Sequence, residues 1–448
     1  MKRRDYIFTR FNEQQDFFDD VVKVGIEQNR KGFAHITVTD AEGNPCYAEI
    51  EFRQKDHEFK FGANIFMLDE MESDEKNQAY KESFAKLFNM ATLPFYWKDL
   101  EPQRNFPRYS KDSPRIYRRP SPDLCIEFCR QHSIEPREHA LAYDTWFPDW
   151  LKGVEEKTFK REYERHCAEI AERYADSIPT IEVTNEQQWA LKALDYCYDQ
   201  NYVSDCFKIA RKHFPHNALA INEYQGIFDR YPVRDLYCRT IDAALAKGAE
   251  IDLIGTQFHS FETLENEPQL VNKRYNPQHV YSVLDTLARF GKPLEITEVT
   301  IPAYSNGEED EEIQAALLEK LYSLWFSHPA MKHIVYWNLI DGYAAFAPLG
   351  DMTSGENYYH GGLLRFDTSE KPAYKRLYEL IHNVWHTEGK LISKNGKASF
   401  KGFYGNYEIT VRREGESFTR EIFLGKNRTN CFTLSPDSPS ALRLDKNT

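Results

Sequence analysis

The sequence predicts an α/β fold, a (β/α)8 or TIM barrel with a small accessory β-sandwich formed by the N- and C-terminal segments. Between about residues 59 and 385, short apolar runs alternate with amphipathic stretches, as in repeated βα units. No glycine-rich phosphate loop follows the first apolar run, which argues against a nucleotide-binding doubly wound sheet. The two chain ends alternate apolar and polar residues around turns, as antiparallel strands do.

Eight strands are expected in the barrel, most of them followed by a helix. They are 59–66, 89–93, 137–141, 180–186, 218–223, 251–257, 294–298 and 334–339. Asn276-Pro277 supplies a helix N-cap with a proline in the first turn. Gly248 and Gly291 stand where helix C-terminal caps belong. We therefore expect the barrel to occupy residues 57–386.

The terminal segments are expected to form one β-sandwich. Residues 34–52 and 397–424 both alternate apolar and polar side chains around turn-rich sequences. Neither has enough strands to be stable alone, so the N-terminal segment, 1–56, should pack with the C-terminal segment, 387–448.

The charge and composition of the chain limit the kinds of molecule that it is expected to bind. The net charge of -13 disfavours nucleic acid or an anionic membrane surface, because phosphate binding needs a concentrated basic face. No apolar run is long enough to cross a bilayer, and no secretory signal is visible. We expect a cytoplasmic protein, or a secreted or periplasmic one if a signal peptide has been removed. The eight cysteines lack paired spacing and are expected to be reduced thiols.

Polar residues gather where the predicted strands end, which is the face of such a barrel that carries the active site. They are His139, Asp144, Asn185, Glu186, Asn222, Glu223, Gln257, His259, Glu298, Trp337 and Asp341. A single glutamate at a strand end is more often a solvated loop residue. Six strands here end in polar groups. Burying such groups costs stability unless they form hydrogen bonds with each other or with a ligand.

Glu186 and Glu298 close two strands that face each other across the barrel mouth. Two carboxylates on either side of a glycosidic bond are what retaining hydrolysis requires, one as acid/base and one as nucleophile. Asn185, next to the acid/base, could bind a sugar 2-hydroxyl. This chemistry needs neither a metal nor an organic cofactor.

Six segments resemble the family 10 glycoside hydrolases, whose typical members are endo-β-1,4-xylanases. They are IEVTNE at 181–186, AINEY at 220–224, GTQFH at 255–259, ITEV at 296–299, WNLID at 337–341 and LLRFDTSEKPAY at 363–374. The Asn-Glu and second glutamate segments are shared by a wider clan of retaining barrel glycosidases. GTQFH and the KPAY tail narrow the resemblance to the family.

The resemblance implies the roles of individual residues. Glu186 would be the acid/base and Glu298 the nucleophile, with His259 orienting and ionising Glu298. The other implied sugar-binding residues are His139, Asn185 and Gln257. The aromatic residues near the rim, Tyr143, Trp146, Trp337 and Phe346, are candidates for stacking on sugar faces.

Departures from the family pattern fall on the side of the cleft that binds the sugar beyond the cleaved unit. Pro94 and Phe95 stand where xylanases of this family carry a glutamate-asparagine pair, although Lys98 could supply their lysine. Tyr143-Asp144 replaces a tryptophan-histidine, and Trp146 replaces a glutamine. We expect a carbohydrate substrate, a β-linked plant-type glycan or its oligosaccharides, with xylan-derived chains first.

Three alternatives stay open at this point. A metal-dependent hydrolase could use His139, His259 and Asp144 with a glutamate as ligands, but two histidines close together on one strand are missing. A non-catalytic carbohydrate-binding barrel need not keep both carboxylates. A retaining β-glycosidase of the same clan with another glycone specificity is the closest competitor.

Overall fold

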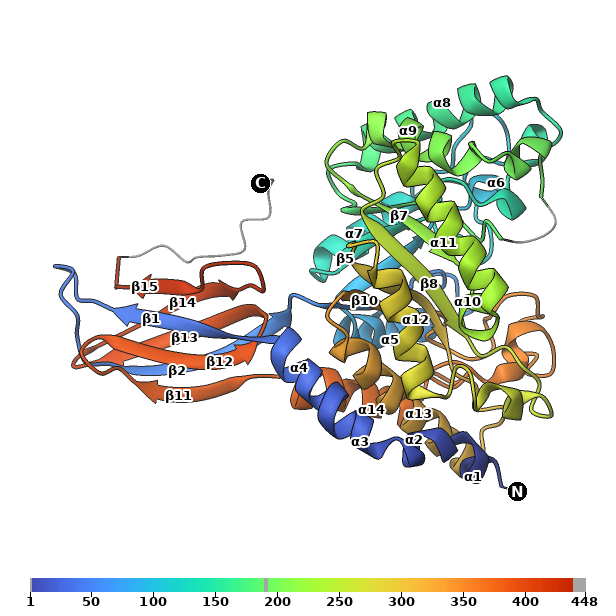
Figure 1. Ribbon diagram of the computed structural model, residues 1–448. Helices are drawn as coiled ribbons and strands as arrows, with labels where there is room; N and C mark the ends of the chain where they lie inside the picture. Colours follow the sequence, from blue (N-terminus) through green and yellow to red (C-terminus); the bar gives the residue numbers. More distant parts are fainter. Residues whose placement is uncertain (1, 189–191, 438–448) are drawn as a thin grey trace.

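The computed structural model describes residues 2–188 and 192–437 and shows a barrel with a β-sandwich lobe beside it (Figure 1). Eight parallel strands close the barrel in the order β10-β3-β4-β5-β6-β7-β8-β9. They are β3 (Lys60–Asn64), β4 (Met90–Pro94), β5 (Glu135–His139), β6 (Thr180–Asn185), β7 (Ala218–Glu223), β8 (Leu253–His259), β9 (Leu294–Thr300) and β10 (Met331–Tyr336). Each overlaps one of the strands expected from the sequence, and the predicted fold class is confirmed.

Helices cover the outside of the barrel. They are α5 (Asp74–Leu87), α6 (Trp97–Leu100), α7 (Pro122–Gln131), α8 (Glu156–Tyr174), α9 (Tyr202–His213), α10 (Gly226–Asp229), α11 (Tyr231–Ala246), α12 (Pro277–Ala288), α13 (Glu308–Ser327) and α14 (Pro372–Glu379). Asn276 caps α12 by accepting a hydrogen bond from the backbone N–H of His279. Gly248 and Gly291 have positive φ after α11 and α12, as their cap positions require.

The sandwich brings the two ends of the chain together, as the sequence predicts. Its strands are β1 (Lys31–Val38), β2 (Glu49–His57), β11 (Glu388–Ile392), β12 (Lys397–Phe403), β13 (Gly405–Arg413), β14 (Glu416–Leu424) and β15 (Cys431–Leu434). One sheet has the order β12-β1-β15 and the other β11-β2-β13-β14. Alternate residues of both sheets, such as Ile36, Ile50 and Ile409, fill a core separate from that of the barrel.

The first part of the N-terminal segment is helical and belongs with the barrel. Helices α1 (Arg3–Ile7), α2 (Thr9–Glu13), α3 (Gln15–Phe17) and α4 (Val24–Asn29) are joined by a π-helical turn, η1 (Phe18–Lys23). Phe11, Phe18 and Val22 are buried in the barrel's own apolar cluster. The sequence analysis placed strands in this segment, but only its second half, β1 and β2, enters the sandwich.

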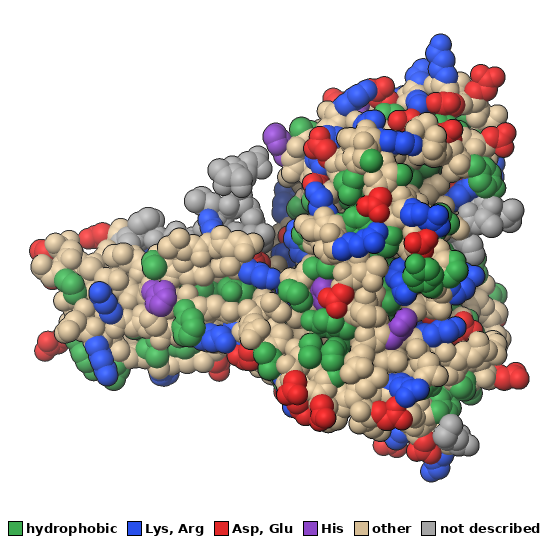
Figure 2. All heavy atoms as spheres, viewed as in Figure 1, with side chains coloured by type: hydrophobic (Ala, Val, Ile, Leu, Met, Phe, Trp, Pro, Cys, Tyr) green, Lys and Arg blue, Asp and Glu red, His purple; other side chains and the backbone are tan. Residues whose placement is uncertain are grey.

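The barrel has two distinct ends. The carboxyl ends of the barrel strands form one face, and the amino-terminal ends form the opposite face, toward the sandwich (Figure 1). Positive and negative side chains are interspersed over the face seen in Figure 2. Within the described residues, every helix is too short or too polar to span a membrane.

Candidate active site

A single amide joins the two carboxyl groups at the barrel mouth. Gln257, near the end of β8, places Nε2 2.7 Å from Glu186 Oε1 and 3.1 Å from Glu298 Oε1. The two oxygens are therefore separated by no more than the sum of these distances, about 5.8 Å, which is shorter than the ~6.5–9.5 Å gap of inverting glycosidases. The geometry leaves room for direct attack by one carboxylate and not for an intervening water.

Glu186 lies directly after β6, where the chain leaves the barrel. Its φ of 52° is in the left-handed region, which non-glycine residues rarely adopt and which is common at functional sites. Tyr143 donates its hydroxyl to Glu186 Oε2 at 2.7 Å. Tyr143 therefore contacts the carboxyl group directly through its hydroxyl, and stacking of its ring on a sugar stays a prediction.

Glu298, on β9, is enclosed, with only 4% of its surface exposed. Burial raises its pKa to about 8, and the neighbouring charge of Glu186 adds to the rise. His259 Nε2 lies 3.0 Å from Glu298 Oε2, and His259 Nδ1 lies 2.9 Å from the hydroxyl of Thr300. Burial lowers the pKa of His259 to about 4, so the imidazole is neutral at pH 7.

This corrects one expectation about ionisation. His259 lies within hydrogen-bond distance of Glu298, but a neutral imidazole adds no positive charge that would ionise the carboxyl group. Asn222 Nδ2 also donates to Glu298 Oε1, at 3.4 Å. In the free protein, burial favours the acid form of Glu298, while the nearby charge of His139 favours the carboxylate form.

Asn185, at the end of β6, has a hydrogen-bond partner for its amide oxygen but, among the described residues, none for its amide nitrogen. Its Oδ1 accepts a hydrogen bond from Asn222 Nδ2 at 3.0 Å. Its Nδ2 is buried and has no hydrogen-bond partner among the described residues. A buried donor next to Glu186 is suited to a ligand hydroxyl.

His139, at the end of β5, is held between two neighbours. Its Nδ1 lies 2.9 Å from Glu182 Oε1 and its Nε2 lies 3.1 Å from the hydroxyl of Tyr96. The carboxylate of Glu182 raises the pKa of His139 against the opposing effect of burial. Arg137 in turn contacts Glu182 at 2.6 Å and Glu295 at 2.9 Å. The barrel interior thus contains a buried line of charges that ends at the active site.

Aromatic rings close one side of the carboxyl pair. Trp337 follows β10, and its ring centroid lies 5.7 Å from those of both His139 and His259. Phe66 and Tyr96 pack with it, and Trp146 lies 5.0 Å from Tyr96. Trp337 and Trp146 therefore belong to one aromatic cluster, and stacking of their rings on a sugar stays a prediction.

Lys98 and Asp144, two further predicted site residues, have partners other than the two carboxyl groups. The side chain of Lys98 is 42% exposed, with Nζ 3.9 Å from Asp149, because α6 turns it outward. Asp144 is buried but accepts a hydrogen bond from the backbone N–H of Ala193 at 3.3 Å, near the ammonium of Lys192 at 3.9 Å. Asp144 therefore anchors a loop after β6.

Tyr96 is the main site residue that the sequence analysis missed. It lies two residues after β4 and two residues before Lys98, which was predicted to be the site residue of this segment. The signal was available, because a polar-tipped aromatic directly after a barrel strand belongs to the active face. In the described residues, no group of three His, Cys, Asp or Glu side chains is arranged to hold a metal ion.

A family model described as glycosyl hydrolase family 10 matches residues 54–380. The chain belongs to this family. Endo-1,4-beta-xylanase 1 of Arabidopsis thaliana is 24% identical over 386 residues, which are 84% of this chain and 36% of that protein. Anti-sigma-I factor RsgI6 of Acetivibrio thermocellus is 22% identical over 406 residues, 87% of this chain and 46% of that protein. The chain thus spans less than half the length of these relatives.

Solved family 10 structures share the barrel. Xylanase 10B from Thermotoga petrophila RKU-1, in complex with xylobiose, superposes with a TM-score of 0.59 and 18% identity. The match covers 73% of this chain and 95% of that structure. At this identity the comparison supports the fold, and the chemistry of this family 10 member is argued from its own residues.

Proposed function

We propose that this family 10 protein is a retaining glycoside hydrolase that cleaves β-linked plant-type glycans or their oligosaccharides, with xylan-derived chains first. The observation that carries the proposal is the Gln257 amide that joins Glu186 and Glu298. Two carboxyl groups this close match the retaining arrangement.

The first step forms a glycosyl-enzyme. An Oε atom of ionised Glu298 attacks the anomeric carbon, while Glu186 gives its proton to the glycosidic oxygen as that bond breaks and the leaving alcohol departs. Because burial raises the pKa of Glu298, the free site must lose the proton of Glu298 while Glu186 keeps its own. The hydrogen bonds from His259, Gln257 and Asn222 support the carboxylate that attacks.

The second step releases the sugar. Glu186, now ionised, takes a proton from water, the water oxygen attacks the anomeric carbon, and the bond to Glu298 breaks with its electrons returning to the carboxylate. Asn185 Nδ2 supplies a donor for the sugar 2-hydroxyl, a contact that strengthens in the transition state. Net retention of anomeric configuration follows from two inversions.

Recognition of the sugar should differ from that of typical xylanases. Tyr96 and Trp146 fill space on one side of the site, and the outward Lys98 offers no ammonium there. A sugar hydroxyl left without a partner in a dry site costs about 1–3 kcal/mol, enough to change which glycone is preferred. A retaining β-glycosidase with a different glycone is therefore the second candidate.

Proton NMR of the first-formed sugar tests the mechanism, since a β-linked substrate should give the β-anomer before mutarotation. A first-formed α-anomer would exclude the double displacement. A product profile over β-linked oligosaccharides and aryl glycosides then identifies the glycone. A protein that binds these sugars but releases no product, with intact Glu186 and Glu298, would instead be a non-catalytic carbohydrate-binding barrel.

A further inference from the structure

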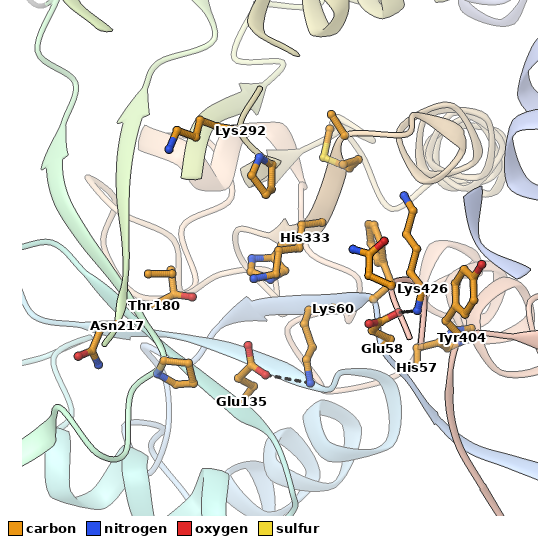
Figure 3. A pocket seen from close by; sticks show the side chains of 18 of the residues that line it. His57, Glu58, Lys60, Glu135, Thr180, Asn217, Lys292, His333, Tyr404 and Lys426 are labelled. Atoms are coloured by element: carbon orange, nitrogen blue, oxygen red, sulfur yellow. Dashed lines mark hydrogen bonds and ion pairs between the residues drawn. The ribbon is translucent and has the colours of Figure 1, made fainter. Parts of the chain in front are cut away.

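A cavity lies at the opposite end of the barrel from the carboxyl pair. It has a volume of about 1430 Å³ and is bounded by the amino-terminal ends of the barrel strands and by the sandwich (Figure 3). Lys60, Glu135 and His333 line it from the barrel, and Tyr404 and Lys426 from the sandwich side. This volume exceeds the ~300–1,000 Å³ typical of small-molecule sites, so a molecule of that class fits.

The charged side chains of this cavity are mostly positive. Five lysine or arginine residues line it against three carboxylates, in a chain whose net charge is -13. Lys60 is paired with Glu135 at 3.0 Å, whereas Lys292 has no ion pair among the described residues. The cavity is therefore a local positive region that favours an anionic occupant.

Arg30 and Lys426 lie near one carboxylate, that of Glu58, which attracts both of them. Arg30 is 7% exposed and donates to the backbone carbonyls of Phe326 and His328. Lys426 donates from Nζ to the carbonyl of Pro329 at 3.1 Å. The backbone N–H of Lys426 donates to Glu58 Oε2 at 3.2 Å, and burial together with the charge of Arg30 lowers the pKa of the Lys426 ammonium against the attraction of Glu58. Two cations that share one carboxylate leave a net positive charge, which a bound anion would offset.

His333 adds a polar group of a different kind. It is fully buried on β10, and its Nδ1 lies 3.1 Å from Glu295 Oε2. Arg137 keeps Glu295 ionised, so Nδ1 carries the hydrogen and donates it. Nε2 then presents a lone pair, and it has no hydrogen-bond partner among the described residues. Figure 3 places this ring among the cavity-lining side chains, between Lys292 and the Lys60–Glu135 pair.

We propose that this cavity binds a hydroxylated organic anion, a small molecule that carries a carboxylate or phosphate group on a polyol body. The anionic group is held by the cations around Arg30 and Lys426, and a hydroxyl donates to Nε2 of His333. This site is separate from the carboxyl pair, and its occupation does not depend on the proposed hydrolysis.

Isothermal titration of the 448-residue chain tests the proposal with four probes. D-Glucuronate and D-glucose 6-phosphate carry both features, D-glucose lacks the charge, and sulfate lacks the hydroxyls. We expect at least one of the hydroxylated anions to bind about tenfold more tightly than D-glucose, and the better of the two identifies the anionic group. If neither binds more tightly than D-glucose, the proposal is wrong.

Two variants assign binding to this cavity. Lys426→Glu should weaken the preferred anion at least tenfold, whereas Lys397→Glu, a matched change on an exposed sandwich lysine outside the cavity, should leave binding unchanged. Equal effects of the two changes would contradict the assignment. His333→Asn keeps a donor toward Glu295 but removes Nε2, so it should weaken the hydroxylated anion and spare sulfate. An equal loss for both probes would remove His333 from the site.

Discussion

His259 Nε2 lies 3.0 Å from Glu298 Oε2, and burial keeps this imidazole neutral. The pair is therefore a hydrogen bond and not an ion pair at neutral pH. Glu298 must become ionised without a cation in contact, in an enclosed site that raises its pKa to about 8. The first two predictions follow from this relationship.

The acid limb of the kcat/KM profile should lie above the ordinary glutamate pKa of about 4.3, because the free protein must remove a proton from Glu298 before attack. Rates on an aryl glycoside between pH 4 and 9 measure this limb. His259→Gln keeps a neutral donor and should move the limb by less than His259→Ala does. A wild-type limb at or below pH 4.3 would show that the site does not hold this proton.

Glu298→Gln should stabilise the protein more at pH 8 than at pH 4.5. A carboxyl whose pKa is raised on folding contributes stability that is complete below the unfolded-state pKa and is lost as pH rises toward the folded value, here about 8. The glutamine is neutral throughout and escapes this loss, a gain of roughly 2–4 kcal/mol at pH 8. Urea unfolding at both pH values measures the difference.

Glu42→Gln, on an exposed loop of the sandwich, is the matched control and should change stability equally at both pH values. If Glu298→Gln behaves in the same way as this control, burial does not hold the proton on Glu298.

Glu186→Ala should slow natural oligosaccharides by about 10²–10⁴-fold and spare aryl glycosides with good leaving groups in the first step. The reason is that an acidic phenol departs without protonation. Comparing kcat/KM for a series of leaving groups should give a steep dependence on leaving-group acidity in the variant and a shallow one in the wild type. Equal losses across the series would remove Glu186 from the acid role.

Tyr96→Phe should lower kcat/KM about 5–10-fold, since it removes the hydroxyl that fixes Nε2 of His139 at 3.1 Å. Lys98→Ala, two residues away and turned outward, should stay within about twofold of the wild type. Steady-state kinetics on one oligosaccharide compares the two. A larger loss for Lys98→Ala would restore Lys98 to the site and contradict the structure.

Arg137→Met should destabilise the fold by about 3–5 kcal/mol, because Glu182 and Glu295 would be left buried without their shared cation. Arg239→Met removes an exposed ion pair with Asp235 and should cost less than about 1 kcal/mol. Denaturant unfolding of both variants gives the comparison. Similar costs would mean that the charges inside the barrel contribute little to its stability.

The sequence by itself determined the barrel. Eight apolar strands that alternate with amphipathic helices can bury their apolar surface in few other arrangements. It also located the ends of the strands, and hence Glu186, Gln257 and Glu298, since side chains at strand ends share one face whatever the loops do. The sandwich could be predicted because the strands of each terminal segment are too few to form a stable sheet without the strands of the other.

Tertiary structure decided what depends on packing across the molecule. Whether Lys98 or Tyr96 faces the carboxyl pair depends on the turn into α6, because Tyr96 is the N-cap of this short helix and Lys98 lies within it. The neutral state of His259 depends on how completely its neighbours exclude water, which no local pattern records. The cavity at the amino-terminal face exists only where the barrel and the sandwich meet, so no single segment encodes it.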